Sequence, residues 1–235
     1  MRIALALMMP MVLPSATLAA DNELTDAETK DGWILLFDGK TLNGWMTSSE
    51  KPSKTPVQDG CINPHKCGGY MMIHEKQWGD FVLSLDFKIS KGCNSGIFVR
   101  TFPLKTRPGK SLGYNGIEIA IDDTKGAGYH DTGAIYDLVK CTRNAMKPTG
   151  EWNHIVITCD KNLIEVELNG EKVSRMNLEE WTQPFRRPDG TPHKFDTAWR
   201  DHHKKGYIGL QDHGSPCWFK NIKLKPLNEG RSHRP

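Results

Sequence analysis

One short segment carries two carboxylates on the same side of an expected strand. Residues 116–122 read Gly-Ile-Glu-Ile-Ala-Ile-Asp, with isoleucine at every second position. Because a strand alternates its side chains between two faces, one face is isoleucine and the other presents Glu118, Ala120 and Asp122. This pattern is typical of the floor of a sugar-binding site. Cα atoms four residues apart on a strand lie roughly 13 Å apart, so the spacing alone does not establish a catalytic pair.

Two further apolar strands place polar groups opposite their buried side chains. In residues 94–100, Ile97 and Val99 are expected in the core, and in residues 207–213, Ile208 and Leu210 are. The opposite faces then present a mixture of amides, aromatic rings, a cation and a histidine: Asn94, Phe98, Arg100, Tyr207, Gln211 and His213. Such a mixture suits a sugar, because rings cover its apolar face and fixed polar groups orient its hydroxyls.

A solvated surface is the alternative interpretation of each of these side chains. The outer face of an antiparallel sheet is normally polar. The pairs Arg186-Arg187 and His202-His203 are likewise interpreted as parts of a solvated loop, since adjacent side chains diverge. No catalytic triad, phosphate loop or dinucleotide fingerprint occurs. The combination of groups therefore favours a site more than any single residue does.

The elements that must position these groups are short strands. Residues 81–89 alternate between an apolar face and a polar face, and further strands are expected at 134–138, 152–159, 163–168, 171–174 and 218–224. Asn169-Gly170 supplies a two-residue hairpin turn. About ten short strands without long helical patterns favour a β-sandwich or barrel over a parallel α/β fold. The one long segment without strands, 177–205, is expected to be functional or disordered.

Residues 1–20 have the pattern of an export signal. Arg2 precedes an apolar run and a stretch of small residues, and the run is too short to span a membrane. We therefore expect a signal peptide at 1–20, one domain at 21–235 and a secreted or periplasmic protein without a membrane anchor. The near balance of 31 Lys and Arg against 28 Asp and Glu does not indicate a nucleic-acid partner.

Six cysteines in an exported chain predict disulfides. Six cysteines allow 15 pairings, which the sequence does not resolve. Cys61 and Cys67 flank a short loop, so they are the pair expected to form a bridge. A metal site at these two cysteines with His65 is disfavoured, because no second tight Cys/His pair follows. We expect no metal and no other cofactor.

The chain resembles the 3-keto-disaccharide hydrolase family, which was first catalogued as a domain of unknown function. The order and spacing of the matching stretches hold from about residue 31 to 226. The stretches are 36–45, 79–81, 94–100, the Glu118 strand, 132–138, 150–153, 168–170, 188–191 and 208–216, and the last of these, with its Gln-Asp-His-Gly-Ser-Pro block, is the most specific.

The resemblance implies a concanavalin A-like jelly-roll sandwich of two curved antiparallel sheets, whose concave sheet binds the ligand. It implies a sugar substrate oxidised to a ketone at C3. That ketone acidifies the C2 proton, so a base, an oxyanion-stabilising group and elimination at C1 followed by hydration would give net hydrolysis. The base is expected to be Glu118 or His213, with Arg100 and Asn94 orienting oxygens. The expected substrate-binding residues are Asn94, Phe98, Asp122, Asp123, Tyr136, Gln211 and Asp212.

One departure from the family affects the site. Many members have Gln where this chain has Ala120, and an Asp that aligns with Asp123 and not with Asp122. Alternation favours Asp122 in the site, whereas the family pattern favours Asp123, and a bulge would reconcile them. Two other functions stay open, which are a non-catalytic lectin-like domain and a conventional glycosidase with two carboxylates. The sequence does not resolve the oligomeric state.

Overall fold

The computed structural model describes residues 20–227, so nearly all of the expected export signal lies outside the described residues. Its one α-helix, α1 (Asp26–Lys30), begins with a capping box formed by Thr25 and Glu28. The strands are β1 (Ile34–Leu35), β2 (Trp45–Thr47), β3 (Met71–His74), β4 (Phe81–Ile89), β5 (Asn94–Thr101), β6 (Ile117–Asp122), β7 (Asn153–Asp160), β8 (Leu163–Leu168), β9 (Glu171–Asn177), β10 (Tyr207–Gln211) and β11 (Cys217–Pro226). Three short 3₁₀ helices are η1 (Leu112–Asn115), η2 (Leu178–Glu180) and η3 (Trp199–Asp201).

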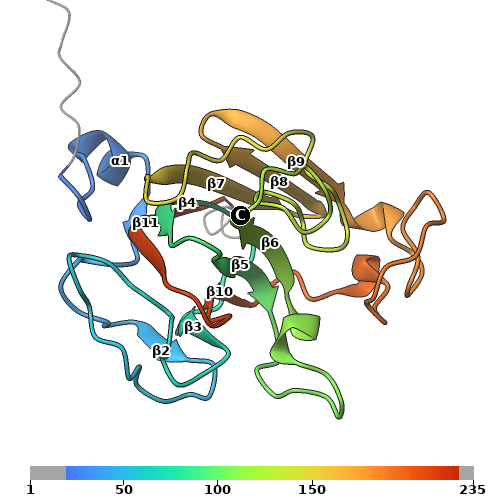
Figure 1. Cartoon of the computed structure of the whole chain (residues 1–235), viewed down its shortest axis with the longest axis horizontal. Coiled ribbons are helices and arrows are strands. Elements are labelled where there is room, and N and C mark those ends of the chain that lie inside the picture. The colour runs from blue at the N-terminus through green and yellow to red at the C-terminus, as the bar shows by residue number, and fades with distance from the viewer. Residues whose placement is uncertain (1–19, 228–235) are drawn as a thin grey trace, which may run out of the picture.

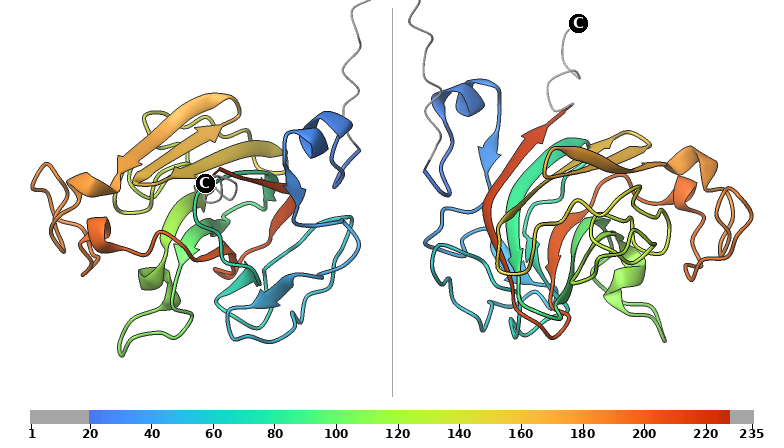
Figure 2. Two further views of the ribbon diagram at one scale, coloured as in Figure 1. Left: turned by 180° about the vertical axis from the view of Figure 1, so that it is seen from behind. Right: turned by 45° about the horizontal axis from the view of Figure 1, so that its top comes forward.

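The strands form two antiparallel sheets packed face to face, which confirms the predicted all-β sandwich (Figure 1). One sheet has the order β1-β11-β4-β7-β8-β9 and the other β2-β3-β10-β5-β6. The two further views show the sheets as separate curved layers, with the long loops gathered around their ends (Figure 2). Among the described residues, no helix has the length and apolar character needed to cross a bilayer.

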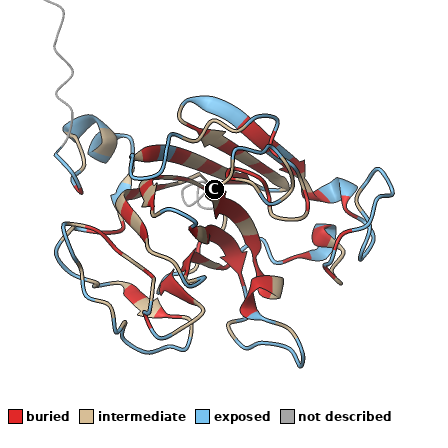
Figure 3. Cartoon of the chain, viewed as in Figure 1, coloured by how far each residue is buried: buried red, intermediate tan, exposed pale blue. Residues whose placement is uncertain are grey.

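The core lies between the sheets and follows from strand alternation. β4 alternates without exception between fully buried and partly exposed residues, as its sequence predicts. On β6, Ile117, Ile119 and Ile121 are all fully buried in the same core. Burial is accordingly concentrated along the strands, while the loops carry most of the exposed surface (Figure 3). The isoleucine face of the Glu118 strand therefore holds that strand against the opposite sheet.

The predicted hairpin is present and the predicted strand at 134–138 is wrong. Asn169 and Gly170 both have positive φ, 51° and 83°, as a two-residue turn between β8 and β9 requires. Residues 134–138 instead form a turn, with the Leu138 N–H donating to Ile135 O at 2.9 Å and Asp137 at φ 56°. Its strand-like pairing is limited to isolated bridges of Ile135 with Ile119 and Val139. Local turn geometry thus overrides the apolar alternation.

The long segment 177–205 is built around buried aromatic side chains. Trp181, Phe195 and Trp199 are each at most 4% exposed and belong to the main core. The solvated-loop interpretation is wrong for two members of this segment. His202 is buried, and its Nε2 donates to Arg100 O at 3.0 Å. The Arg187 side chain, 8% exposed, donates to Asp137 O at 2.6 Å.

All six cysteines are free thiols, so the expected Cys61–Cys67 bridge is wrong for this structure. The two thiols donate to different backbone carbonyls, Cys61 Sγ to Asp59 O at 3.3 Å and Cys67 Sγ to Gly69 O at 3.6 Å. A disulfide requires the two sulfur atoms to face one another at a bonding distance. The turn residues between these two cysteines direct the side chains elsewhere.

Candidate functional site

Glu118 lies on the side of the five-stranded sheet that faces away from the core, which we call the site face. Its direct partner across the β5–β6 ladder is Phe98, and the next pairs on the same face are Ala120 with Gly96 and Asp122 with Asn94. Directly opposed residues of an antiparallel pair point to the same side. The register therefore brings four predicted site residues, Glu118, Phe98, Asp122 and Asn94, onto one surface.

The Glu118 carboxyl group leans over Gly96 on the adjacent strand. A Cβ atom at position 96 would lie 2.7 Å from Glu118 Oε1, so this approach requires glycine. Burial raises the pKa of Glu118 to about 8, and the attraction of Lys194 opposes that rise. A carboxylate with such a pKa is a much stronger base than an exposed one. The geometry thus supplies a base of unusual strength on the site face.

Tyr70 and Gln211 form the second part of the site. Gln211 Nε2 donates to the Tyr70 hydroxyl at 3.0 Å, while Gln211 Oε1 is buried without a hydrogen-bond partner. Burial raises the pKa of Tyr70, and the charge of Glu118 raises it further. Phe98 lies against the Tyr70 ring, with the centroids 6.1 Å apart, and is fully buried, so it supports the site from below and is not open to a ligand.

Aromatic side chains of the 129–139 turn form the third part of the site. The Tyr136 N–H donates to Glu118 O at 2.8 Å, which fixes the 129–139 turn beside β6. The Tyr136 ring stacks on His130 with centroids 4.6 Å apart. Burial raises the pKa of Tyr136, with Glu118 as the next cause. The Lys194 ammonium lies 4.1 Å from the centroid of the Tyr136 ring.

We use the name Glu118 cluster for Glu118, Tyr70, Gln211, Tyr114, Tyr136 and Lys194. Tyr70, Tyr114, His130 and Lys194 had not been predicted as site residues. Lys194 lies in the 177–205 segment, whose length had suggested a functional loop. Tyr70 precedes β3 and Tyr114 lies in η1, so neither follows from alternation along a predicted strand.

Asp122 and Asp123 separate at the end of β6. Asp122 accepts from Asn94 Nδ2 at 2.9 Å on the site face, in register with its partner and without a bulge. Burial raises the pKa of Asp122, and Asp131 and Asp123 add to that rise. Asp123 turns away and accepts from the Gly92 N–H at 2.7 Å. Alternation therefore places Asp122, and not Asp123, on the face that carries Glu118.

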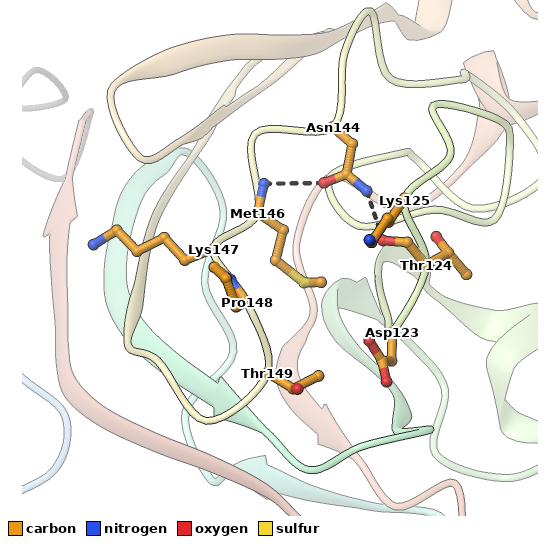
Figure 4. A pocket seen from close by; sticks show the side chains of 8 residues that line it. All are labelled: Asp123, Thr124, Lys125, Asn144, Met146, Lys147, Pro148 and Thr149. Atoms are coloured by element: carbon orange, nitrogen blue, oxygen red, sulfur yellow. Dashed lines mark hydrogen bonds between the residues drawn. The ribbon is translucent and has the colours of Figure 1, made fainter.

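Asp123 instead borders a separate cavity of about 410 Å³ (Figure 4). Asn144 crosses one end of this cavity, donating to Thr124 O at 2.9 Å and accepting from the Met146 N–H at 3.0 Å. Glu118 is not part of its lining, which consists of residues 123–125, 144 and 146–149. The cavity therefore lies apart from the Glu118 carboxyl group, whose pKa is strongly raised, and we base the site on the Glu118 cluster.

Asp212 and His213 lie beyond the end of β10. Asp212 accepts from the Lys66 N–H at 2.8 Å and the Gly214 N–H at 3.0 Å, so its carboxylate holds two loops together. His213 is exposed in the loop that follows. Neither side chain has a contact with Glu118 among the interactions of the described residues. The structure thus leaves these two predicted site residues outside the Glu118 cluster.

Arg100 is the predicted site residue that the structure most clearly removes from the site face. Tyr207 pairs with Thr101 and Gly209 with Phe98, so two residues of β5 oppose one residue of β10 in a bulge. Arg100 occupies that bulge at φ 53°. Its side chain is fully buried and donates to Asp80 Oδ1 at 3.2 Å and Lys161 O at 2.9 Å. The alternation prediction for Arg100 is wrong because the bulge changes the face.

The Glu118 cluster contains several groups that can exchange protons or donate hydrogen bonds. Within residues 20–227, no group of three or more His, Cys, Asp or Glu side chains lies close enough to hold a metal ion. A carboxyl group with a raised pKa can accept a proton, and phenols and an ammonium can donate hydrogen bonds to oxygen atoms. The cluster has one such carboxyl group, three phenols and one ammonium. The arrangement is suited to removing a proton next to a group that gains negative charge.

Comparisons with known proteins agree on one family. Residues 32–225 match the model of the 3-keto-alpha-glucoside-1,2-lyase-like domain. A 3-keto-disaccharide hydrolase from Bacteroides thetaiotaomicron is 29% identical over 84% of this chain and 79% of its own length. Among solved structures, a putative glycosyl hydrolase from Parabacteroides distasonis has a TM-score of 0.71 and 33% identity, covering 83% of this chain and 99% of its own. A second from the same organism has a TM-score of 0.73 and 28% identity, covering 89% and 100%.

A more distant likeness concerns the fold alone. A Bacillus subtilis protein of unknown function with a galectin-like fold has a TM-score of 0.51 at 12% identity, covering 88% of this chain and 94% of its own. Galectin-like folds are sandwiches of two antiparallel sheets. The predicted lectin-like architecture is thereby confirmed.

Proposed function

The chain belongs to the 3-keto-alpha-glucoside-1,2-lyase-like family, and on that premise we propose that it cleaves glycosides whose sugar carries a ketone at C3. The observation that carries the proposal is the Glu118 carboxyl group, whose pKa burial raises to about 8 on a face lined with phenols. A C3 ketone acidifies the C2–H bond, so a strong base at this position has a defined task. The family match and the relative named as a 3-keto-disaccharide hydrolase support this substrate class.

The reaction begins at C2. Glu118 takes the C2 proton, and the electron pair of the C2–H bond forms an enolate with the C3 oxygen. The enolate then expels the C1 substituent, which breaks the C1–O bond and leaves an unsaturated 3-keto sugar. Water adds across the new double bond and restores the saturated sugar, so the sum of the steps is hydrolysis. The leaving oxygen needs one proton, and this mechanism assigns it to the Tyr136 phenol, which is near enough to Glu118 for that charge to raise its pKa.

The proposal is tested with 3-keto-trehalose and 3-keto-glucosides, following release of the free sugar. Glu118→Gln keeps the shape of the side chain but removes the base, so kcat is expected to fall about 10²–10⁴-fold. Glu167→Gln, on β8 of the other sheet, is the matched control and should retain turnover. Wild-type turnover by Glu118→Gln would rule out Glu118 as the base.

Deuterium separates this chemistry from a conventional glycosidase. During turnover in D₂O, protonation of the C2 position should incorporate deuterium there, and a C2-deuterated substrate should react more slowly. A glycosidase with two carboxylates breaks only the C1–O bond and leaves the C2 hydrogen in place. A folded protein that releases sugar without C2 exchange would contradict the elimination pathway.

The pH dependence of kcat/KM shows whether Glu118 acts as a base or as an acid. A base must be deprotonated, so kcat/KM should rise with pH and level off above about 8. A general acid with the same pKa would give the opposite slope. A profile that falls between pH 7 and 9 would therefore contradict Glu118 as the base.

The proposal includes export from the cytoplasm, which rests on the basic and apolar pattern of residues 1–20. Cell fractionation with mass determination of the mature chain tests it. A product that begins near residue 21 outside the cytoplasm is expected, and a full-length cytoplasmic product would contradict it.

A further inference from the structure

Lys194 lies near Glu118, because its ammonium packs on the ring of Tyr136, whose backbone N–H donates to Glu118 O. It is the charge that acts on the Glu118 carboxyl group, and Glu118 in turn raises the pKa of Lys194, which burial lowers. Yet among the ion pairs of residues 20–227, none joins Lys194 to Glu118. The two groups attract one another without direct contact.

The ammonium of Lys194 is held by aromatic rings. Its Nζ lies 4.1 Å from the ring centroid of Tyr136, 5.2 Å from that of Phe195 and 5.6 Å from that of Tyr114. Ring faces attract a cation but do not satisfy its N–H donors with oxygen acceptors. Lys194 is exposed as a whole residue, while its ammonium is partly buried among these rings, and no hydrogen bond of residues 20–227 uses the N–H donors of that ammonium.

The backbone at Lys194 is fixed from two directions. The Lys194 N–H donates to Asp137 Oδ2 at 2.8 Å, and Asp137 Oδ1 accepts from Arg187 at 3.0 Å. Two residues further along, Asp196 accepts from both terminal nitrogens of Arg107, at 3.0 and 2.9 Å. A lysine with this support is placed in advance and does not depend on a mobile loop.

Two other cations near the cluster already have oxygen partners. Lys110 lies 4.5 Å from the Tyr114 ring but also pairs with Asp196 at 3.8 Å. Arg187 is bound to Asp137 and to Leu138 O. Among the cations near the cluster in residues 20–227, Lys194 is therefore the one whose side-chain N–H donors have no oxygen acceptor.

We propose that the Lys194 ammonium binds the C3 ketone oxygen of the substrate and stabilises the enolate that forms when Glu118 removes the C2 proton. The proposal rests on the function proposed above. The base and the oxyanion donor must reach adjacent carbon centres of one substrate, which requires them to be close but not paired with each other. Lys194 and Glu118 meet this condition. Lys194 then takes the role that the sequence had assigned to Arg100.

The interaction is a hydrogen bond and an ion–dipole contact, not a covalent one. A lysine amine can also add to a ketone, with loss of water, to give an iminium ion. Replacing Lys194 by arginine distinguishes the hydrogen-bonded form from the iminium form. A guanidinium donates hydrogen bonds to an oxyanion. It stays protonated in water, so it does not add to a ketone to form an iminium ion.

The test compares Lys194→Met, Lys194→Arg and, as the matched control, Lys172→Met on the exposed part of β9. Lys194→Met should lower kcat about 10²–10³-fold, as removal of one oxyanion donor does, and should slow C2 deuterium exchange equally. Lys194→Arg should recover a large part of both rates. Lys172→Met should match the wild type, and thermal unfolding should show that every variant is folded.

Three outcomes decide the proposal. Full turnover by folded Lys194→Met, while Glu118→Gln is inactive, would overturn the Lys194 role and leave the proposed function intact. Borohydride treatment with substrate that adds the mass of the reduced sugar to Lys194 would overturn the non-covalent form. Absence of C2 exchange on every 3-keto glycoside in the wild type would remove the proposed function and the Lys194 role with it.

Discussion

Arg100 and Lys194 show two opposite ways in which this protein holds a cation. Arg100 is fully buried, with fixed partners on Asp80 and Lys161, and its backbone carbonyl accepts from His202. Lys194 lies exposed beside three rings, attracted to Glu118 but not paired with it. Fixed partners and complete burial indicate a structural charge, whereas accessible donors near a strong base indicate a charge kept for a ligand.

The difference originates in the backbone. Arg100 sits in a bulge with positive φ, so its side chain leaves the face that alternation assigns to it. The neighbouring Gly206 gives room for this path, because a Cβ there would lie 2.5 Å from the Arg100 carbonyl carbon. Lys194 reaches the site from a loop whose course is set by Asp137 and Asp196.

The largest expected effect is on stability at Arg100. Arg100→Met removes a buried ion pair and should lower the free energy of unfolding by about 3–5 kcal/mol. Activity per folded molecule should change little, because Arg100 does not reach the site face. Urea unfolding and active-site titration measure the two quantities. Arg175→Ala, whose exposed pair with Glu165 is 3.5 Å long, should cost less than about 1 kcal/mol. Equal costs for the two variants would contradict the distinction.

The second effect concerns pH and stability at Glu118. Its pKa is raised in the folded protein to about 8, from an ordinary value of 4.5, so the folded state holds a proton that the unfolded state releases. Stability should therefore fall as pH rises from about 4.5 to 8 and then become constant. Glu118→Gln removes this dependence and should be more stable by about 1–3 kcal/mol above pH 8. Parallel unfolding curves for the two proteins from pH 5 to 9 would contradict the raised pKa.

The third effect is smaller and tests the support of Lys194. Asp137→Asn weakens the ion pair to Arg187 and should cost about 1–2 kcal/mol of stability. It should also lower kcat, because the Lys194 ammonium loses its fixed position. When Lys194→Met is already present, Asp137→Asn should have little further effect on kcat. Additive losses in this double-mutant cycle would show that Asp137 acts independently of Lys194.

The smallest effect is expected at His213. This side chain is exposed on a loop, so His213→Ala should change the free energy of unfolding by less than about 0.5 kcal/mol. Because Glu118 is the proposed base, kcat should fall less than about tenfold, below the range expected for an acid–base residue. A loss as large as that of Glu118→Gln would place His213 in the chemistry and weaken the comparison between the two cations.

The fold followed closely from the sequence where the signals were local. The alternation of β4 and β6 and the Asn169-Gly170 turn predicted strands and a hairpin that the structure contains. The turn at Ile135 to Leu138 was missed because a short apolar run has the same composition in a strand and in a buried turn. The Cys61–Cys67 bridge failed because proximity in sequence does not set the direction of the two side chains.

The sequence by itself determined the two-sheet sandwich, the face on which Glu118 and Asp122 lie, and the resemblance to the family. These follow from a period of two along single strands and from motifs with fixed spacing, so they need no knowledge of distant contacts. Only the tertiary structure decided that Arg100 turns into the core and that Lys194, Tyr70 and Tyr136 gather near Glu118. A bulge and a folded loop depend on contacts between residues far apart in the chain, and no local pattern specifies them.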